Sequence, residues 1–164
     1  MVYGVLTMSY KMYLDYSVGS EFYPDYVTNL VAKQSKSLLE TVGYKAQIIQ
    51  HPNEPSIKLI INDKFVARII EGCNSISILI LFVSFIFAYA GKLKTTLFYL
   101  LFGCVLVYAT NLFRIVFLTI GLYHYPWRRE ILHSVIFPLI IYGMVFLLWM
   151  FWVNRFVNLK PQNE

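Results

Sequence analysis

The stretch TTLFYLLFGCVLVYATNLFRIVFLTIGLY, residues 95–123, decides the class of fold. It holds 29 residues and a single charged side chain, Arg114. A helix of about 20 apolar residues crosses the hydrocarbon core of a bilayer, so this stretch is long enough to span it. Backbone groups in lipid must bond within their own segment, so the stretch is helical despite its β-branched residues. The sequence therefore predicts an integral membrane protein.

The composition of the whole chain agrees with this prediction. Of its 164 residues, 58% are hydrophobic and 14% are charged, whereas soluble domains have about 45–50% and about 25%. This excludes a disordered chain and disfavours an ordinary soluble enzyme. The net charge of +5 arises after residue 73, where seven basic residues accompany two acidic ones. These basic residues flank apolar runs singly or in pairs, which predicts contact with membrane lipid and no nucleic-acid partner.

Two further apolar segments, residues 74–90 and 134–154, contain no charged side chain. The second has 21 residues, and the first has 17, which is at the short end for a span. Together with residues 95–123 they predict a mainly α membrane protein with three transmembrane helices. The expected spans lie at about residues 73–90, 95–123 and 131–153.

The first 16 residues are apolar and aromatic, but Lys11 and Asp15 interrupt them and they are too short to span a bilayer alone. They predict either an interfacial helix or the end of a helix whose beginning is missing, which would make three and a half spans. No charged n-region or small-residue cleavage site is present, which disfavours a signal peptide.

Residues 17–71 form a polar, charge-balanced block between the apolar segments. Apolar residues at helical spacing predict a helix at about 24–42, and short strands follow at about 46–70 with a hairpin turn at Asn62-Asp63. A block of about 55 residues is marginal as a free domain, so we expect it to pack against the membrane bundle. The predicted domains are a partial helix at 1–16, the α/β block at 17–71, a transmembrane bundle at 72–154 and a tail at 155–164.

Three polar residues fall at one depth of the predicted bundle. Cys73 begins the first span, and His133 opens the third. Arg114 lies 20 residues after Lys94, which is about 30 Å of helix and carries it back across the core. Because consecutive spans alternate in direction, Cys73, Arg114 and His133 end at one membrane face.

The positive-inside rule orients this face. The opposite side carries Lys92, Lys94, Arg155 and Lys160. The loop between the second and third spans, on the Cys73 side, carries Arg128 and Arg129. The excess of basic residues opposite Cys73 predicts that Cys73 and the 17–71 block lie outside the cytoplasm and that the tail at 155–164 is cytoplasmic.

The surroundings of Cys73 distinguish it from Cys104. Glu71 lies two residues before Cys73, and Asn74 and Ser75 follow it directly, which is too polar for a packing position. Cys104 lies in the middle of a predicted span, where a free cysteine is usually a small buried hydrophobe. Two cysteines at such positions predict neither a disulfide framework nor a metal site.

Arg114 lies inside an apolar run, and Asn111 is one turn earlier on the same helix face. An arginine at such a place usually faces a partner or a water-filled cavity. His124, at the far end of the same segment, competes with His133 for the role of acid or base.

A cysteine, a histidine and an arginine at one level suit acyl transfer. A thiol is a strong nucleophile as the thiolate, and a neighbouring imidazole can take its proton. The tetrahedral intermediate then carries an oxyanion, which the N–H groups and charge of an arginine can stabilise in a low-dielectric site. These residue types predict thiol protease or transpeptidase chemistry at the membrane surface.

Three short motifs resemble the exosortase/archaeosortase family of integral-membrane cysteine transpeptidases. They are Glu71-Gly72-Cys73-Asn74-Ser75, Asn111-Leu112-Phe113-Arg114 and His133-Ser134. The stretch from residue 29 to 75 looks like the short exosortase F branch of Gram-negative bacteria. The resemblance extends from about residue 25 to 152, and each motif lies on its own predicted span.

The resemblance implies that Cys73 is the nucleophile, that His133 is the acid/base and that Arg114 binds the oxyanion or positions the substrate. The substrate would be the C-terminal sorting signal of a secreted protein, namely a short motif, a transmembrane helix and a basic tail. The acyl group would then pass to an acceptor or to water, with no metal or cofactor. The enzyme would lie in the bacterial inner (plasma) membrane with its active site on the extracytoplasmic face.

The chain also departs from the family pattern. Many members have Cys-Ser-Gly at the nucleophile, whereas Asn74 and Ser75 follow Cys73 here. The sequence therefore does not identify which backbone or side-chain hydrogen-bond donors complete the site. The expected supporting residues are Glu71, Asn74, Ser75 and Asn111. Many relatives have more spans, and this chain begins inside what looks like their first helix, which predicts a truncated start.

Two other classes of function compete with this reading. One is a non-catalytic small helical membrane subunit or assembly factor, in which the polar residues join helices. The other is a haem or ion-handling protein that uses His124 and His133. If the enzyme reading holds, the short strands beside the site are suited to pair with an extended peptide. The substrate, the acceptor and the oligomeric state stay open at the level of sequence.

Overall fold

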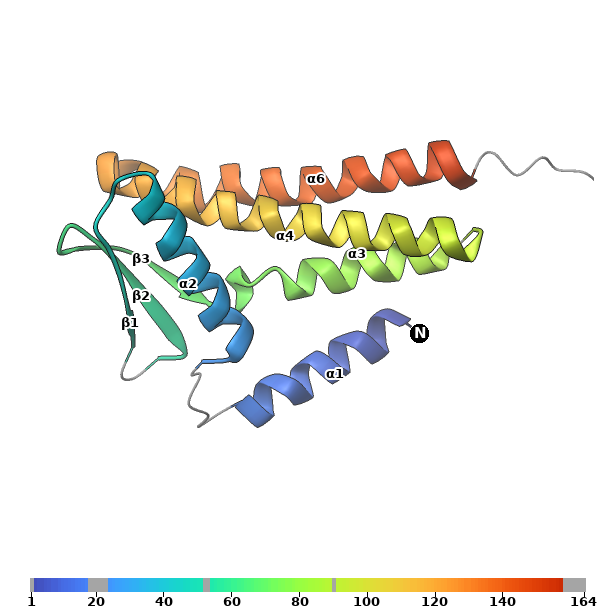
Figure 1. Cartoon of the computed structure of the whole chain (residues 1–164), viewed down its shortest axis with the longest axis horizontal. Helices are drawn as coiled ribbons and strands as arrows, with labels where there is room; N and C mark the ends of the chain where they lie inside the picture. Colours follow the sequence, from blue (N-terminus) through green and yellow to red (C-terminus); the bar gives the residue numbers. More distant parts are fainter. Residues whose placement is uncertain (1, 18–23, 52–53, 90, 158–164) are drawn as a thin grey trace, which may run out of the picture.

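The computed structural model describes residues 2–17, 24–51, 54–89 and 91–157, except the side chains of His133, Phe137 and Val157. Two long helices, α4 (Leu93–His124) and α6 (Phe137–Trp152), run antiparallel beside the shorter α3 (Ile76–Ala88). A small sheet and α2 (Tyr26–Thr41) lie at one end of this bundle, and α1 (Val2–Ser17) packs along α3 (Figure 1). The fold is thus mostly helical with a small sheet, as the sequence predicts.

Two helical segments are long and apolar enough to cross a membrane. They are Leu93–His124, with 32 residues, and Pro126–Phe156, with 31. The second joins several helical pieces: η2 (Pro126–Arg128), α5 (Arg129–Ile131), the π-helical turn η3 (Leu132–Ile136), α6, and the π-helical turn η4 (Val153–Val157). Two of the three expected spans therefore have the required length.

The expected span at residues 73–90 is shorter in the structure. Its helix, α3, has 13 residues, which is about 20 Å and less than the hydrocarbon thickness of about 30 Å. The residues before it form a 3₁₀ turn, η1 (Glu71–Cys73), and Ser75 takes a left-handed conformation with φ of 63°. A third span stays a prediction.

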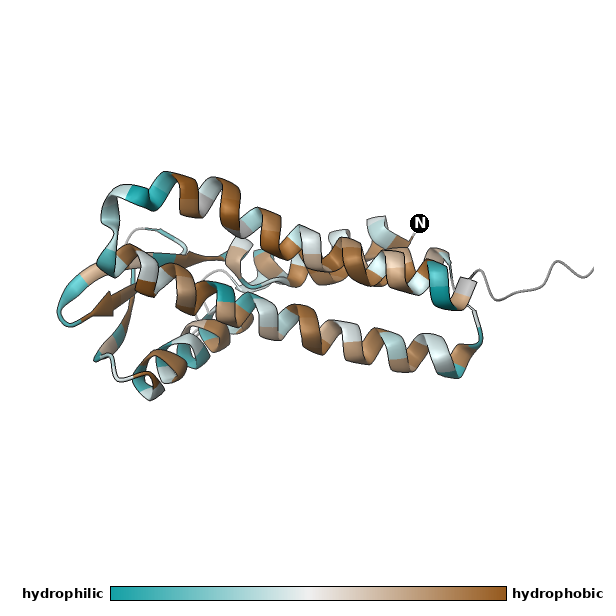
Figure 2. Ribbon diagram, turned by 90° about the horizontal axis from the view of Figure 1, so that it is seen from above, coloured by the Kyte–Doolittle hydropathy of each residue, from teal (hydrophilic) through white to brown (hydrophobic). Residues whose placement is uncertain are grey.

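Large apolar side chains are exposed along the bundle. On α4 they include Phe98, Phe102, Val105 and Phe117, and on α6 Leu139, Phe146, Leu147 and Phe151. Figure 2 shows apolar residues along the length of the long helices, with polar residues gathered at α2, the loops and the helix ends. An apolar surface of this extent is unfavourable in water, and it fits a bundle surrounded by lipid.

The sheet is antiparallel with the order β1-β2-β3, formed by β1 (Ala46–Gln50), β2 (Ser56–Ile61) and β3 (Lys64–Ile70). Asn62 and Asp63, with φ of 47° and 62°, form the two-residue turn between β2 and β3. Positive φ at both positions matches the twist of a hairpin, and Asn and Asp tolerate it.

The helix α2 has a defined start and end. The carboxylate of Asp25 accepts a hydrogen bond from the Thr28 amide at 3.0 Å and caps the first turn. Gly43, with φ of 97°, follows the last turn, a conformation that favours glycine.

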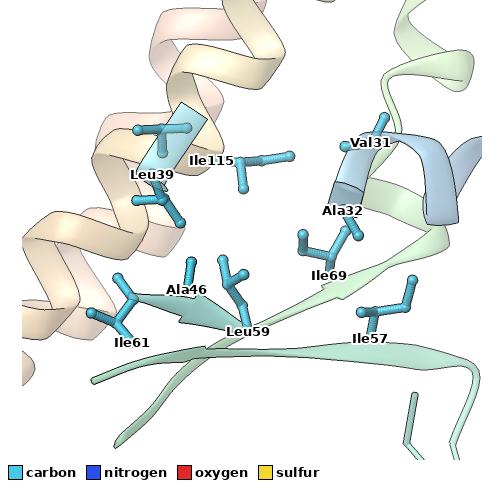
Figure 3. Packing of buried hydrophobic residues seen from close by; sticks show 10 residues of the cluster. Val31, Ala32, Leu39, Ala46, Ile57, Leu59, Ile61, Ile69 and Ile115 are labelled. Carbon is cyan, nitrogen blue, oxygen red and sulfur yellow. The ribbon is translucent and has the colours of Figure 1, made fainter. Parts of the chain in front are cut away.

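One hydrophobic core joins the polar block to the bundle. Apolar side chains of α2 (Val31, Ala32 and Leu39) meet those of the sheet (Ile57, Leu59, Ile61 and Ile69) and Ile115 of α4 (Figure 3). The helix α2 and the sheet therefore pack against the bundle, because α4 supplies part of the core that a small block lacks.

A second core holds the three bundle helices together. Phe82 and Ile86 of α3, Val107 of α4 and Val145 of α6 are fully or almost fully buried in it. The helices α3 and α4 approach so closely that a Cβ atom at Gly103 would overlap the Phe82 ring. Within this bundle the Tyr99 hydroxyl also donates a hydrogen bond to the Leu148 carbonyl at 2.6 Å.

Candidate active site

Cys73 lies at the junction of the sheet and the bundle. It is the last residue of η1, directly after β3 and before α3, and its side chain is half-buried. It lines a cavity of about 500 Å³, within the range of ligand sites. The other lining residues are Ala67, Arg68 and Ile70 of β3, Leu118 and Leu122 of α4, and Trp127, Arg129, Glu130 and Ser134.

Asn111 connects Cys73 to Arg114. Its side-chain Nδ2 donates a hydrogen bond to the Cys73 carbonyl oxygen at 2.7 Å, and its Oδ1 accepts one from Arg114 Nη1 at 3.3 Å. Asn111 is only 1% exposed. Asn111 and Arg114 share a face of α4 because they are three residues apart. The structure thus links the Cys73 backbone to Asn111 and Arg114, although these two residues do not line the cavity of Cys73.

Arg114 retains hydrogen-bonding capacity at this place. Its Nε is buried and has no hydrogen-bond partner among the residues that the structure describes. An unpaired donor on a buried cation is costly. This atom is therefore suited to receive an acceptor that arrives with water or a ligand.

Asn74 serves the fold beside Cys73. Its Nδ2 donates hydrogen bonds to Tyr10 Oη at 2.7 Å and to Thr28 Oγ1 at 3.2 Å, and its Oδ1 accepts one from the Ile76 amide at 3.1 Å. These bonds cap α3 and tie η1 to α1 and α2. Asn74 does not line the cavity of Cys73, so its contacts hold the backbone next to the thiol.

Ser75 is also engaged in the backbone turn. Its left-handed φ of 63° is unusual for a residue other than glycine, and its hydroxyl donates to the Asn74 carbonyl at 2.6 Å. It too is absent from the lining of the cavity. Asn74 and Ser75 therefore orient the chain at Cys73 through local hydrogen bonds.

Glu71 lies on the neighbouring side of η1. It lines a second cavity, of about 420 Å³, together with Glu54, Pro55, Ser56, Arg68, Ile70 and Gly72. Partial burial raises the pKa of the Glu71 carboxyl, and the negative charge of Asp25 raises it further. The protonated form of Glu71 is thus favoured relative to a free glutamate.

The two histidines occupy different surroundings. His133 lies in η3, and its side chain is outside the described part of the structure; the next residue, Ser134, lines the cavity with Cys73. His124 is exposed at the end of α4, and its Nε2 is 3.0 Å from Tyr44 Oη. This bond attaches the end of α4 to the polar block, and His124 does not line the cavity.

Sequence reasoning missed several residues of the cavity. Arg68 was not singled out, yet it lines both cavities, and its Nη1 is 2.6 Å from Glu54 Oε2. Trp127, Arg129 and Glu130 enter the cavity from the segment that connects the two long helices. The position of Arg68, five residues before Cys73 on a predicted strand, was the one available signal.

The alternative of a haem or ion-handling protein relies on His124 and His133 as ligands. Among the described residues, no group of three or more His, Cys, Asp or Glu side chains is placed to hold a metal ion. His124, one of its two candidate ligands, contacts Tyr44 instead.

The long apolar helices and the half-buried thiol in a cavity together define an integral membrane protein with a candidate cysteine site. Residues 17–155 match the family model of the transmembrane exosortases. The match covers most of the chain, so the protein belongs to the transmembrane exosortase family. Comparison with curated proteins and with solved structures finds no match. Family membership indicates a membrane transpeptidase-type role of the cysteine class.

Proposed function

We propose that the protein is a membrane-embedded cysteine peptidase or transpeptidase that cleaves the C-terminal sorting signals of exported proteins. The observation that carries this proposal is the hydrogen-bonded chain from the Cys73 carbonyl through Asn111 to Arg114, together with the position of Cys73 in the lining of the cavity. It ties the backbone of the candidate nucleophile to a cation on α4, and acyl transfer needs a nucleophile and a group that stabilises the oxyanion. The assignment to the exosortase F branch is part of the same proposal.

In the first step, the imidazole of His133 takes the proton of the Cys73 thiol, and the thiolate attacks the carbonyl carbon of the scissile peptide bond. The carbonyl oxygen becomes an oxyanion. Arg114 stabilises it with N–H groups that the bond to Asn111 leaves available. Through its two hydrogen bonds, Asn111 fixes the position of the Arg114 side chain relative to the Cys73 backbone.

In the second step, the tetrahedral intermediate collapses and the carbon–nitrogen bond breaks. The imidazolium of His133 gives its proton to the leaving amine, and a thioester with Cys73 remains. An acceptor amine, a hydroxyl or water then attacks the thioester and regenerates the thiol. His133 takes the proton of this nucleophile and returns it to the sulfur.

The reaction would take place on the extracytoplasmic side of the bacterial inner membrane. The start of α4 and the end of α6 lie at the end of the bundle opposite the sheet (Figure 1). Lys92 and Lys94 are at the start of α4, and Arg155 is in η4 after α6. The positive-inside rule favours the cytoplasm for that end. The cavity of Cys73 and the sheet then face the compartment into which substrates are exported.

The test is the second-order rate of Cys73 labelling by a membrane-impermeant maleimide, measured from outside right-side-out vesicles in a Cys104→Ala background. His133→Ala and Arg114→Ala are the test variants. Their matched controls are His124→Ala, since His124 contacts Tyr44 and does not line the cavity, and Arg155→Ala, since Arg155 lies in η4 after α6. Fast labelling that slows in His133→Ala but not in His124→Ala is the expected result.

Slow labelling that is indifferent to both histidines would contradict the proposal. Cys73 would then be an ordinary packed thiol, and the protein would be a non-catalytic helical subunit or assembly factor. Processing that survives Cys73→Ala would lead to the same conclusion.

A further inference from the structure

The strand β3 is an edge of the sheet, and the cavity of Cys73 runs along it. Successive side chains of a strand point to opposite faces. Ala67 is buried toward the core, whereas Arg68 and Ile70 are exposed on the other face, yet all three line the cavity. A cavity that touches both faces of one strand lies beside its edge, where the main chain is accessible.

The hydrogen-bond alternation of the sheet shows which main-chain groups point to this edge. The His51 amide donates to the Ser56 carbonyl at 2.9 Å, so the main chain of Ser56 points toward β1. Main-chain groups alternate sides along a strand, so those of Lys58 also point toward β1 and away from β3. Ser56 pairs with Ile70, and Lys58 pairs with Arg68. Arg68 and Ile70 therefore direct their N–H and C=O groups away from β2, into the cavity.

This edge is available for pairing. The sheet ends at β3, and within the described residues no main-chain hydrogen bond joins β3 to an element other than β2. Exposed edges of this kind are templates for an added strand. Arg68 and Ile70 also line the second cavity, which reaches from Ser56 of β2 across β3 to Glu71.

The edge leads directly to the candidate nucleophile. β3 ends at Ile70, and η1 carries the chain to Cys73 three residues later. β3 runs from its hairpin at the far end of the sheet toward α3 and the bundle (Figure 1). If the proposed function holds, a substrate that enters from outside and continues into the membrane runs in the same direction.

We propose that β3 is the docking strand for the substrate. The extended segment that precedes the cleaved bond adds to the sheet beside β3, parallel to it, and exchanges main-chain hydrogen bonds with Arg68 and Ile70. This places the following carbonyl carbon at the Cys73 thiol. Main-chain bonding gives affinity for an extended peptide of almost any sequence, and the pockets on either side of the edge select side chains. The proposal rests on the proposed function of Cys73.

The test uses a peptide electrophile whose backbone is altered one nitrogen at a time. The probe is acetyl-Val-Thr-Val-Thr with a C-terminal vinyl sulfone, together with four analogues that each carry one N-methyl group. The rate of Cys73 modification is measured in membranes that contain the full chain with Cys104→Ala. N-methylation at alternate residues should lower the rate about two- to tenfold, since each removes a hydrogen bond. Methylation between them should have little effect.

Two results would overturn the docking strand. One is a rate that shows no alternation along the peptide. The other is a parent peptide that reacts no faster than acetyl-threonine vinyl sulfone, because main-chain pairing should help any extended sequence. Iodoacetamide, which needs no peptide docking, is run in parallel. A slow iodoacetamide rate that does not depend on His133 refutes the proposed function, whereas a fast rate with a flat methylation profile refutes only the docking strand.

A pair of variants at Arg68 tests whether the main chain of β3 binds the peptide. Arg68→Ala removes the side chain, and Arg68→Pro also removes the outward N–H; edge strands tolerate proline where the N–H is not in the ladder. Arg68→Pro should react with the parent peptide about two- to tenfold more slowly than Arg68→Ala, with equal iodoacetamide rates. Gln50→Pro, at an outward-facing position on the opposite edge strand, is the control and should change neither rate. Equal peptide rates in the two Arg68 variants would contradict the proposal.

Discussion

Replacing Asn111 by alanine should loosen the link between the bundle and the candidate nucleophile. Asn111 is 1% exposed, donates to the Cys73 carbonyl at 2.7 Å and accepts from Arg114 at 3.3 Å. Asn111→Ala removes both bonds at once. It leaves a carbonyl oxygen and a guanidinium N–H without their partner in a partly buried region.

The magnitude follows from these two bonds. A neutral hydrogen bond contributes about 0.5–1.5 kcal/mol, and a bond to a charged group about 1.5–3 kcal/mol. The bond from Arg114 is long, which favours the lower part of its range. Polar contacts between membrane helices are often weaker, averaging about 0.6 kcal/mol. We therefore expect Asn111→Ala to lower the free energy of unfolding by about 1–3 kcal/mol.

The same substitution should also slow the reaction of Cys73. Displacement of a reacting group by about 1 Å can cost about 10²-fold in rate. Without the Asn111 bond, the Cys73 backbone loses a fixed point one turn from Arg114. We expect maleimide labelling of Cys73 to slow at least about tenfold, measured in vesicles with Cys104→Ala.

Two further variants make this experiment specific. Asn111→Asp keeps an oxygen acceptor for Arg114 but loses the donor to the Cys73 carbonyl, so it separates the two bonds. Thr119→Val is the control on the same helix, because Thr119 is fully buried and its hydroxyl bonds only locally, to the Ile115 carbonyl at 2.7 Å. Labelling of Asn111→Ala at the wild-type rate, or equal slowing in Thr119→Val, would refute the reasoning.

Three other predictions concern charge, packing and orientation. The pKa of the Glu71 carboxyl is raised in the folded protein, so the free energy of unfolding should fall as pH rises from the ordinary glutamate pKa through the raised pKa. Glu71→Gln should abolish this dependence when Tm is measured against pH. A Tm profile of Glu71→Gln that runs parallel to that of the wild type would contradict the prediction. Gly103→Ala should lower Tm in detergent, since its Cβ meets an aromatic ring, whereas Gly143→Ala, with open space around its Cβ, should leave Tm unchanged or raise it; equal shifts would refute the close packing. In a cysteine-free background, Asp63→Cys should react with impermeant maleimide from outside and Lys94→Cys should not, and the reverse pattern would invert the proposed orientation.

Much of the fold could be predicted because its causes are local. The apolar length of residues 95–123 requires a helix in lipid whatever it packs against. The dipeptide Asn62-Asp63 tolerates positive φ, and the structure has its hairpin there. The motifs around Cys73 and Arg114 also identified the family, which the match over residues 17–155 confirms.

The roles of the polar residues beside Cys73 depended on long-range contacts. The sequence predicts a supporting role for Asn74, and the structure shows that its amide bonds to Tyr10 and Thr28 from two distant segments. His124 was a candidate base, and the structure pairs it with Tyr44, which is 80 residues away in sequence. A spacing pattern cannot contain such pairings, because they arise when separate elements pack.

The sequence by itself determined the class of the protein: a helical membrane protein with a cysteine, an arginine and a histidine at one predicted depth. Tertiary structure alone decided that Asn111 joins Cys73 to Arg114 and that Arg68 lies on an open strand edge beside the thiol. The physical reason is that hydrophobic length and turn propensity act within one segment. A cavity and its hydrogen bonds exist only where a strand, a helix and a connecting segment meet.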